Sequence, residues 1–330
     1  MTYLVTGGAG FIGSNLVKHL VSQGKKVRVL DNFVNGNRAN LTFPGSDAVE
    51  VLEGDVTNFA TCLRAIEDVD VVFHMACLGV RHSLHSPVEN HQVNAFGAIN
   101  MLEAVRKVGV RRYVHVSSSE IYGRTTSFPI TEESTPWPVS VYGGSKLAGE
   151  HYARSYYECW DIPAVCVRPF NNYGPGSHFE GDTGEAIPRF IMRALSGEAP
   201  IVHGDGSVTR DFLFVRDTAR GLAMISEADS LIGEVVNLGY GAEITIAELA
   251  RAVLKAVGRE DLEPIFIEAR PGVTPRLWVD TTKLRNATGF VPEVSLAQGM
   301  RETIEHFRQL LDVNPEAIDQ VDAKNWEAKA

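Results

Sequence analysis

A tyrosine and a lysine stand four residues apart in the segment YGGSK, as Tyr142 and Lys146. On a helix this spacing places both side chains on one face. A phenol normally titrates near pH ~10 and is a poor base at neutral pH. Because a neighbouring ammonium favours the phenolate, the pair predicts a tyrosine that acts as a general base.

A second polar cluster, SSSEIYG, follows the apolar run YVHV. The run is expected to be a buried strand. It would deliver Ser118, Ser119 and Glu120 to the carboxyl end of a parallel sheet, where such folds bind ligands. These three residues, with Tyr142 and Lys146, are the candidate catalytic residues.

A glycine-rich segment, TGGAGFIG, lies between an expected first strand and first helix. Gly7 and Gly8 permit a tight turn. Gly10 lets backbone amides approach a pyrophosphate, and Gly13 allows the helix to pack closely on the strand. The helix N-terminus favours the anion. This context predicts a dinucleotide site, and a positively charged nicotinamide there would also favour the Tyr142 phenolate.

The second expected strand ends in Asp31, where an acid that binds the adenosine ribose is expected. A carboxylate there would repel a 2′-phosphate, so NAD is favoured over NADP. Arg28 lies inside the strand and Arg38 beyond it, so neither supports NADP. Asp55 and Val56 close the next strand and are candidates to hold adenine, although Asp55 is also a plausible helix cap.

The segments that position these residues alternate between strand and helix patterns. Strands are expected at 3–8, 26–31, 49–56, 69–76, 111–118 and 162–171. Helices are expected at 12–24, 57–68, 88–109 and 142–160. Continuous apolar strands in this order predict an α/β fold, a Rossmann-type doubly wound parallel sheet covered on both faces.

After about residue 170 this rhythm breaks into turns and shorter elements, some of them expected to return to the main sheet. We therefore expect an NAD-binding domain over 1–170, which carries the catalytic residues. A smaller mixed α/β part over 171–312 is expected mainly to bind substrate. The last segment, 313–330, is polar and is expected to be loosely ordered.

Bulk properties exclude several classes of protein. The 330 residues are 44% hydrophobic and carry a formal charge of −10, without a basic run for nucleic acid. No apolar run approaches the ~20 residues of a membrane span. The start enters a strand at once and leaves no room for a signal peptide. The four cysteines form neither a C-x-x-C pair nor a metal cluster, so we expect a cytoplasmic protein with reduced thiols.

Together these motifs identify a resemblance. The chain resembles an extended short-chain dehydrogenase/reductase of the NAD-dependent sugar-nucleotide epimerase/dehydratase family over about residues 1–310. The resemblance rests on ten ordered segments, TGGAGFIGS, LDN, GDV, VFHMA, VN, SSSEIYG, YGGSK, RPFNNYGPG, GDGSVTRDF and ARPG.

The resemblance implies a first step shared by the family. Tyr142 would take the proton of the sugar 4-hydroxyl while hydride passes from C4 to tightly held NAD. Lys146 would lower the pKa of the tyrosine and bind the nicotinamide ribose, and Ser118 would hydrogen-bond the 4-oxygen. The residues assigned to the cofactor are Gly7, Gly10, Phe11, Ile12, Gly13, Asp31, Asn32, Asp55, Val56, Ala76, Asn94, Tyr142, Lys146 and Pro169.

The second half would hold the nucleotide sugar. By resemblance, Asn171, Arg210 and Arg270 contact the diphosphate, and arginine suits this role because its planar fork pairs with phosphate oxygens. His203 stands where an aromatic ring often stacks on the base. Arg81 and Ser83 lie in a loop that is expected to face the sugar.

The step after the 4-ketone is less clear from the sequence. Ser118-Ser119-Glu120 has the glutamate of the family's dehydratases and decarboxylases but lacks the aspartate acid of a 4,6-dehydratase. This favours decarboxylation of a UDP-glucuronate-type substrate. Against it, Gly176 replaces an arginine that could meet the carboxylate, and Ser83 stands where decarboxylases tend to have tyrosine. UDP-hexose 4-epimerisation and 4,6-dehydration therefore remain alternatives, with a non-catalytic NAD-binding regulator as a remote one.

Two long helices, expected around 91–108 and 145–160, suggest an assembly. In the family the equivalent pair forms a four-helix bundle between two subunits. The segment SYYECW offers large side chains for such a contact, although packing in the core explains them equally well. A homodimer is therefore expected, with a nucleotide sugar as the small-molecule partner.

Overall fold

The computed structural model describes residues 1–326. Seven strands form one sheet in the order β10-β6-β5-β4-β1-β2-β3, and every neighbouring pair runs parallel. The bounds are β1 Thr2–Thr6, β2 Lys26–Asp31, β3 Val49–Glu53, β4 Val71–His74, β5 Arg112–Val116, β6 Ala164–Pro169 and β10 Val235–Leu238. The strand order reverses between β1 and β4, so a ligand crevice is expected at their carboxyl ends. The predicted doubly wound sheet is confirmed, and β10 is a later strand that returns to it.

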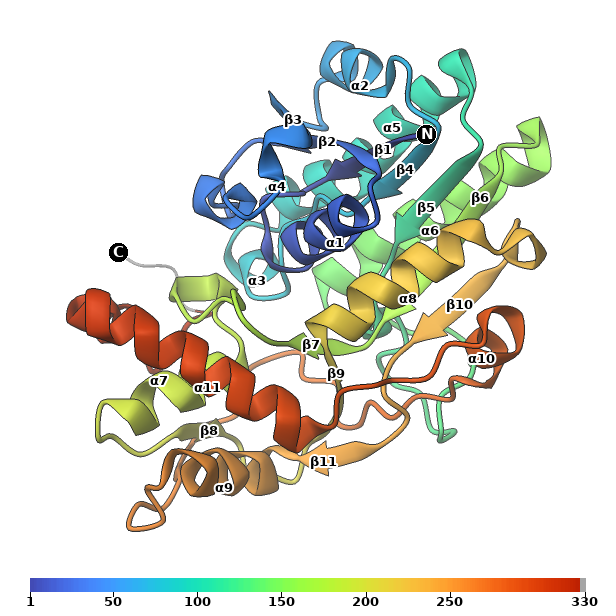
Figure 1. Cartoon of the computed structure of the whole chain (residues 1–330). Coiled ribbons are helices and arrows are strands. Elements are labelled where there is room, and N and C mark those ends of the chain that lie inside the picture. Colours follow the sequence, from blue (N-terminus) through green and yellow to red (C-terminus); the bar gives the residue numbers. More distant parts are fainter. Residues whose placement is uncertain (327–330) are drawn as a thin grey trace.

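Helices cover both faces of this sheet (Figure 1). One face carries α1 Phe11–Ser22, α8 Val215–Glu227 and α10 Thr282–Thr288. The other carries α2 Phe59–Ile66, α5 Gly97–Val108 and α6 Val141–Trp160. Alternate strand residues supply the two cores, since Val5 packs with the first group and Leu4 with the second.

The helix predicted over 88–109 is interrupted. The short helices α3 His82–His85 and α4 Pro87–His91 come first, and a π-helical turn over Gln92–Phe96 separates α4 from α5. Such wide turns are often found at functional sites. Here the turn carries Asn94 beneath the loop that contains Arg81.

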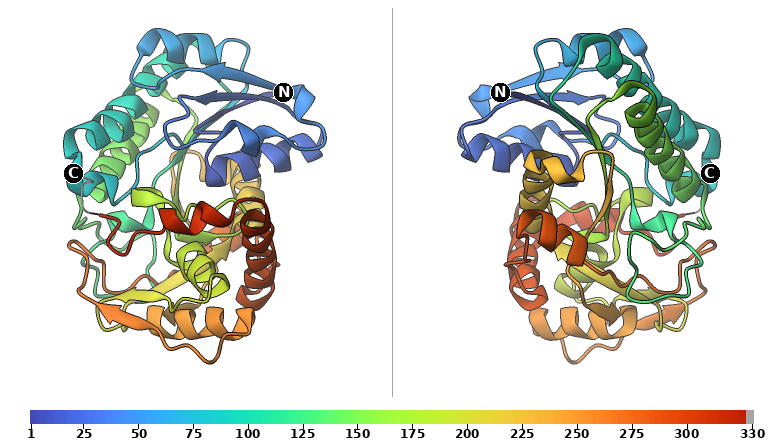
Figure 2. Two further views of the ribbon diagram at one scale, coloured as in Figure 1. Left: turned by 90° about the vertical axis from the view of Figure 1, so that its left-hand side faces the viewer. Right: turned by 90° about the vertical axis from the view of Figure 1, so that its right-hand side faces the viewer.

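A second lobe lies below the sheet in Figure 2. Its strands are β7 Asn171–Tyr173, β9 Thr209–Phe214 and β11 Glu243–Thr245 in one small sheet, and β8 Ile201–His203 and β12 Ile265–Ile267 in another. Its helices are α7 Ala186–Leu195, α9 Ile246–Val257 and α11 Leu296–Val313. They share an apolar core of their own. None of the helices within residues 1–326 is long and apolar enough to cross a membrane.

The tail after α11 differs from the expectation of a loosely ordered segment. Ala317, Val321 and Trp326 are buried, and the first two belong to the core of the second lobe. The polar composition of the segment hides these few apolar anchors. Its described part, up to residue 326, is therefore packed against the second lobe.

Candidate active site

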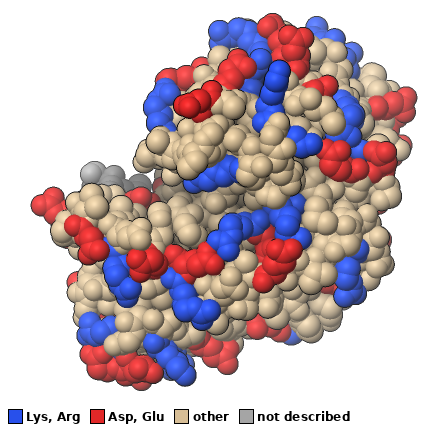
Figure 3. All heavy atoms as spheres, viewed as in Figure 1, with Lys and Arg blue, Asp and Glu red and all other residues tan. Residues whose placement is uncertain are grey.

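A cavity of about 450 Å³ lies between the two lobes. Figure 3 shows the molecule hollowed there, with basic side chains along the hollow in this view. The cavity runs from the glycine loop, past Tyr142, to Arg270 in the second lobe. Its size is typical of a site for a small molecule or cofactor.

The glycine loop, residues 7–13, lets a ligand approach the backbone closely at one end of the cavity. Gly7 has a φ of +69°, which favours glycine. A Cβ on Gly13 would lie 2.2 Å from the Gly7 carbonyl oxygen, so only glycine lets α1 start this close to β1. The N-terminus of α1 thus meets the cavity with free backbone amides, a ready anion site.

Asp31 ends β2 at the same edge of the sheet and is buried. Its Oδ2 accepts from the Ala9 backbone N–H at 2.9 Å and its Oδ1 from that of Phe33 at 2.8 Å. Each oxygen keeps a lone pair for a ribose hydroxyl. Arg28 pairs with Glu50, and Arg38 with Glu53, so both cations are already partnered. This arrangement fits NAD and gives no support to a 2′-phosphate.

Most predicted residues line the cavity. For the cofactor end these are Gly7, Gly10, Phe11, Ile12, Gly13, Asp31, Asn32, Val56, Ala76, Tyr142, Lys146 and Pro169. For the catalytic and substrate ends they are Ser118, Ser119, Glu120, Arg81, Asn171, His203, Arg210 and Arg270.

Three predicted residues, Asp55, Asn94 and Ser83, lie behind the cavity wall. Asp55 accepts a hydrogen bond from Asn32 Nδ2 at 2.7 Å. Asn94 is buried and accepts from the Leu78 backbone N–H at 2.8 Å. Ser83 Oγ donates to the Val80 carbonyl at 2.6 Å. In the structure these side chains shape the loops that line the cavity.

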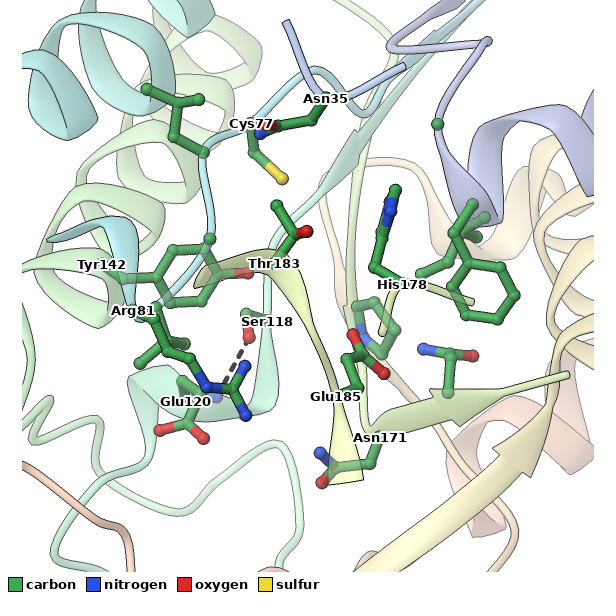
Figure 4. Close-up of a pocket in the computed structure, with 18 of the residues that line it drawn as sticks. Asn35, Cys77, Arg81, Ser118, Glu120, Tyr142, Asn171, His178, Thr183 and Glu185 are labelled. Atoms are coloured by element: carbon green, nitrogen blue, oxygen red, sulfur yellow. Dashed lines mark hydrogen bonds between the residues drawn. The ribbon is translucent and has the colours of Figure 1, made fainter. Parts of the chain in front are cut away.

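The predicted catalytic group comes together at the middle of the cavity. Figure 4 shows the Tyr142 hydroxyl directed into it, with Ser118 beside it. Ser118 is close enough to Tyr142 to lower the pKa of the phenol. Lys146 Nζ donates to the Val116 carbonyl oxygen at 2.5 Å, at the end of β5. Helix α6, whose first turn is capped by Ser140, and strand β5 therefore hold all three residues.

Burial is the main influence on the pKa values of Tyr142 and Lys146. Burial raises the pKa of Tyr142 above its ordinary value, and Ser118 opposes this only in part. Burial also lowers the pKa of Lys146. A positive charge beside the phenol, such as that of Lys146 or of an oxidised nicotinamide when bound, would oppose this effect of burial.

Glu120 is anchored to the second lobe. Thr274 Oγ1 donates to Glu120 Oε2 at 3.0 Å, and the Glu120 backbone N–H donates to Ser118 Oγ at 3.2 Å. The Glu120 charge also acts on Arg210 and Arg270, where it opposes the lowering of their pKa by burial. The carboxylate thus lies between the catalytic serine and the arginines of the substrate end.

A second carboxylate at the sugar end was missed by the sequence analysis. Glu185 lies across the cavity from Tyr142, close to Asn171, in Figure 4. Burial raises the pKa of Glu185 to about 7, and Arg81 opposes the rise. The residue is the last of a turn-rich segment, NNYGPGSHFEGDTGE, whose composition predicted only irregular structure.

The substrate end has unused hydrogen-bonding capacity. Within residues 1–326, Arg81 Nε, Arg270 Nη1 and Asn171 Oδ1 are buried without a partner. Buried polar atoms are normally paired, so these atoms indicate a polar ligand. Burial, followed by repulsion from Arg270 and Arg189, lowers the pKa of Arg81 to about 9. Such a cluster of arginines suits an anion such as a diphosphate.

Comparison with known proteins decides the family. The profile of the NAD dependent epimerase/dehydratase family matches residues 3–239. The chain belongs to this family. Enzymes of this family are NAD-dependent, as the resemblance implied. No group of side chains in the described 326 residues has the make-up of a metal site.

Individual relatives catalyse different reactions. A UDP-glucose 4-epimerase of Mycolicibacterium smegmatis is 36% identical over 93% of this chain and 99% of its own. UDP-glucuronic acid decarboxylase 2 of Arabidopsis thaliana is 34% identical over 93% of this chain and 68% of its own. The dTDP-glucose 4,6-dehydratase DesIV of Streptomyces venezuelae, solved with NAD bound, matches with a TM-score of 0.88 and 31% identity, over 96% of this chain and 99% of its own.

Proposed function

We propose that this enzyme is a 4-epimerase of a UDP-hexose. The observation that carries the proposal is a pair of carboxylates at the sugar end, Glu120 beside Arg210 and Arg270, and Glu185 beside Arg81. A C5 carboxylate would have to be buried beside two others, which is costly. A neutral hydroxymethyl group meets no such repulsion. The proposal thus departs from the decarboxylase favoured on sequence alone, and the relation to a UDP-glucose 4-epimerase supports it.

In the proposed reaction Tyr142 accepts the proton of the 4-hydroxyl, and Ser118 donates a hydrogen bond to the same oxygen as it becomes a carbonyl. Bound NAD supplies the hydride acceptor and a positive ring charge. Lys146 ties helix α6, which also carries Tyr142, to the end of β5 through its hydrogen bond to the Val116 carbonyl oxygen. The 4-keto sugar would then rotate while Arg210 and Arg270 retain the diphosphate. Hydride would therefore return to the opposite face of C4.

Decarboxylation of a UDP-glucuronate is the second candidate. Glu120 favours it, because its backbone N–H donates to Ser118 Oγ and its carboxylate is thereby placed where the reactions of the family diverge. Arg81, with Nε unpartnered, is the cation that would meet the substrate carboxylate. Dehydration ranks below both, since Ser119 offers no acid for the departing hydroxyl.

Product masses separate the three reactions. The purified enzyme is incubated with UDP-glucose, UDP-N-acetylglucosamine and UDP-glucuronate. We expect an isomer of unchanged mass from at least one hexose and no loss of 44 Da from the uronate. A loss of 44 Da would establish the decarboxylase, and a loss of 18 Da would establish the dehydratase.

We also propose a homodimer formed through α5 and α6. Phe96 directly before α5, Val108 at the end of α5 and Trp160 at the end of α6 are each about half exposed, at 50%, 48% and 49%. Exposed aromatic and aliphatic side chains of this size mark contact surfaces. Light scattering should give a mass near twice 36.1 kDa, and a monomer mass would remove the proposal. A cytoplasmic location remains a prediction from the sequence.

A further inference from the structure

The last described residues of the chain, 322–326, pack against a wall of the cavity. Asn325 is only 3% exposed. Its Nδ2 donates to the carbonyl oxygens of Gly181 at 2.8 Å and Gly184 at 3.0 Å. Its Oδ1 accepts from Arg189 Nη1 at 3.1 Å. One buried amide thus ties the loop before Glu185 to helix α7.

The same segment also binds the second terminal nitrogen of the Arg189 guanidinium. Arg189 Nη2 donates to the backbone carbonyls of Asp322 and Ala323. Arg189 lines the cavity, and burial lowers its pKa to about 10. Without these oxygens a buried cation would lose most of its partners. The segment therefore sets the direction in which this arginine points.

His203, the residue assigned to the base of the nucleotide, is held by the segment as well. Its ring meets the Trp326 ring edge-on, with 4.5 Å between centroids and 86° between planes. His203 Nε2 lies 2.9 Å from the Ala323 carbonyl oxygen. Because a carbonyl only accepts, Nε2 carries the hydrogen. Burial lowers the pKa of His203 to about 4, so the ring stays neutral at neutral pH.

We propose that residues 322–326 are a positioning element of the nucleotide-sugar site. They hold three parts of its wall at once, namely the loop 181–185, Arg189 and His203. Asn325 acts through this loop, which carries the cavity residues Asp182, Thr183 and Glu185. The inference rests on the proposed function, because its ligand is the nucleotide sugar.

The test compares Asn325→Ala with Asn314→Ala in the full chain. Asn314 is the matched control, an exposed asparagine that begins the same tail. For Asn325→Ala we expect KM for the UDP-hexose to rise about tenfold and kcat to change less than about threefold. Bound NAD should stay at the wild-type level, because the cofactor end is far along the cavity. An unchanged KM, or an equal rise in Asn314→Ala, would overturn the inference.

A second variant separates loop anchoring from packing. Asn325→Asp has nearly the same shape and keeps an acceptor for Arg189, but it cannot donate to the Gly181 and Gly184 carbonyls. We expect it to behave like Asn325→Ala. Wild-type kinetics in Asn325→Asp would show that the two donated hydrogen bonds do not position the loop.

Hydrogen exchange on the wild-type protein covers the case in which the variants unfold. Saturating UDP should slow exchange in both 181–185 and 322–326. Protection that leaves 322–326 untouched while the rest of the cavity is protected would contradict the proposal. A wild type that turns over no UDP-hexose defeats the proposed function first, whereas an active wild type with a normal Asn325→Ala variant defeats only this inference.

Discussion

Thr274 Oγ1 donates a hydrogen bond to Glu120 Oε2 across the two lobes, at 3.0 Å. This hydrogen bond holds the Glu120 carboxylate toward the arginines of the substrate end. We therefore expect no part for Glu120 in the proton transfer. Glu120→Gln should leave C4 oxidation and epimerisation within about tenfold of the wild type, because neither step needs its charge. The measurement is kcat for UDP-hexose conversion, with Thr274→Val as the matched control for loss of the contact alone. A loss of activity beyond about 10³-fold would give Glu120 a direct chemical role.

Tyr142 is the only base that the proposed first step uses. Tyr142→Phe removes the group that accepts the proton, so we expect kcat to fall by at least about 10³-fold. Ser118→Ala removes a hydrogen bond to the 4-oxygen and should cost about 10²-fold. Both proteins should retain NAD, measured after denaturation of the purified enzyme. Activity of Tyr142→Phe near the wild-type level would exclude this tyrosine as the base.

Glu185 should make the stability of the folded protein depend on pH. Its pKa is about 7 in the folded protein, above the ordinary carboxyl value of 4.5, so the folded state binds the extra proton between these values. Stability is therefore lost as pH rises from about 4.5 to about 7. Glu185→Gln escapes this loss. The difference in Tm between variant and wild type should grow over that range and then level off.

The same substitution should relax the discrimination against uronates. Removing the Glu185 charge takes one of two carboxylates, Glu185 and Asp182, away from Arg81 at the sugar end. We expect Glu185→Gln to raise kcat/KM for UDP-glucuronate relative to UDP-glucose by about tenfold. An unchanged ratio would mean that Glu185 does not face the C5 substituent.

Glu150 and Arg168 form a buried ion pair behind SSSEIYG, with 2.5 Å between Oε1 and Nη2. Glu150 is 0% and Arg168 3% exposed, and Arg168 also donates to Tyr122. Glu150→Gln leaves the guanidinium without a counter-charge and should lower the free energy of unfolding by about 3 kcal/mol. Asp261→Asn, at the exposed pair with Arg259, should lower the free energy of unfolding far less, because exposed ion pairs contribute little. Urea unfolding measures both, and equal losses would refute the account of this pair.

Cys77 lines the cavity, whereas Cys159 is exposed on the outer surface of α6 and Cys62 and Cys166 are buried. A thiol reagent should therefore modify two cysteines in the cofactor-free enzyme. Saturating NAD with UDP should protect Cys77 and leave Cys159 reactive. Peptide mass mapping measures the modification of each cysteine separately. Equal protection of both thiols would indicate a global conformational change and would contradict direct shielding of Cys77 by the ligand.

The sheet and the cofactor end followed from local patterns. The spacing of Gly7, Gly10 and Gly13 between a strand and a helix predicted the close packing of α1 on β1. The four-residue spacing of Tyr142 and Lys146 predicted that both lie on one face of a helix. The substrate wall did not, because Glu185 and Arg189 enter the cavity through an irregular loop and the start of α7. The docking of Asn325 depends on tertiary partners more than 130 residues away, which no local pattern records.

The central claim is that hydride leaves C4 of a UDP-hexose and returns to the opposite face of the same carbon. UDP-glucose labelled with deuterium at C4 tests it directly, with the product isolated and its label located. We predict the 4-epimer with the deuterium still at C4 and no exchange with solvent. A product that has lost the label, or one lighter by 18 Da, would contradict the account.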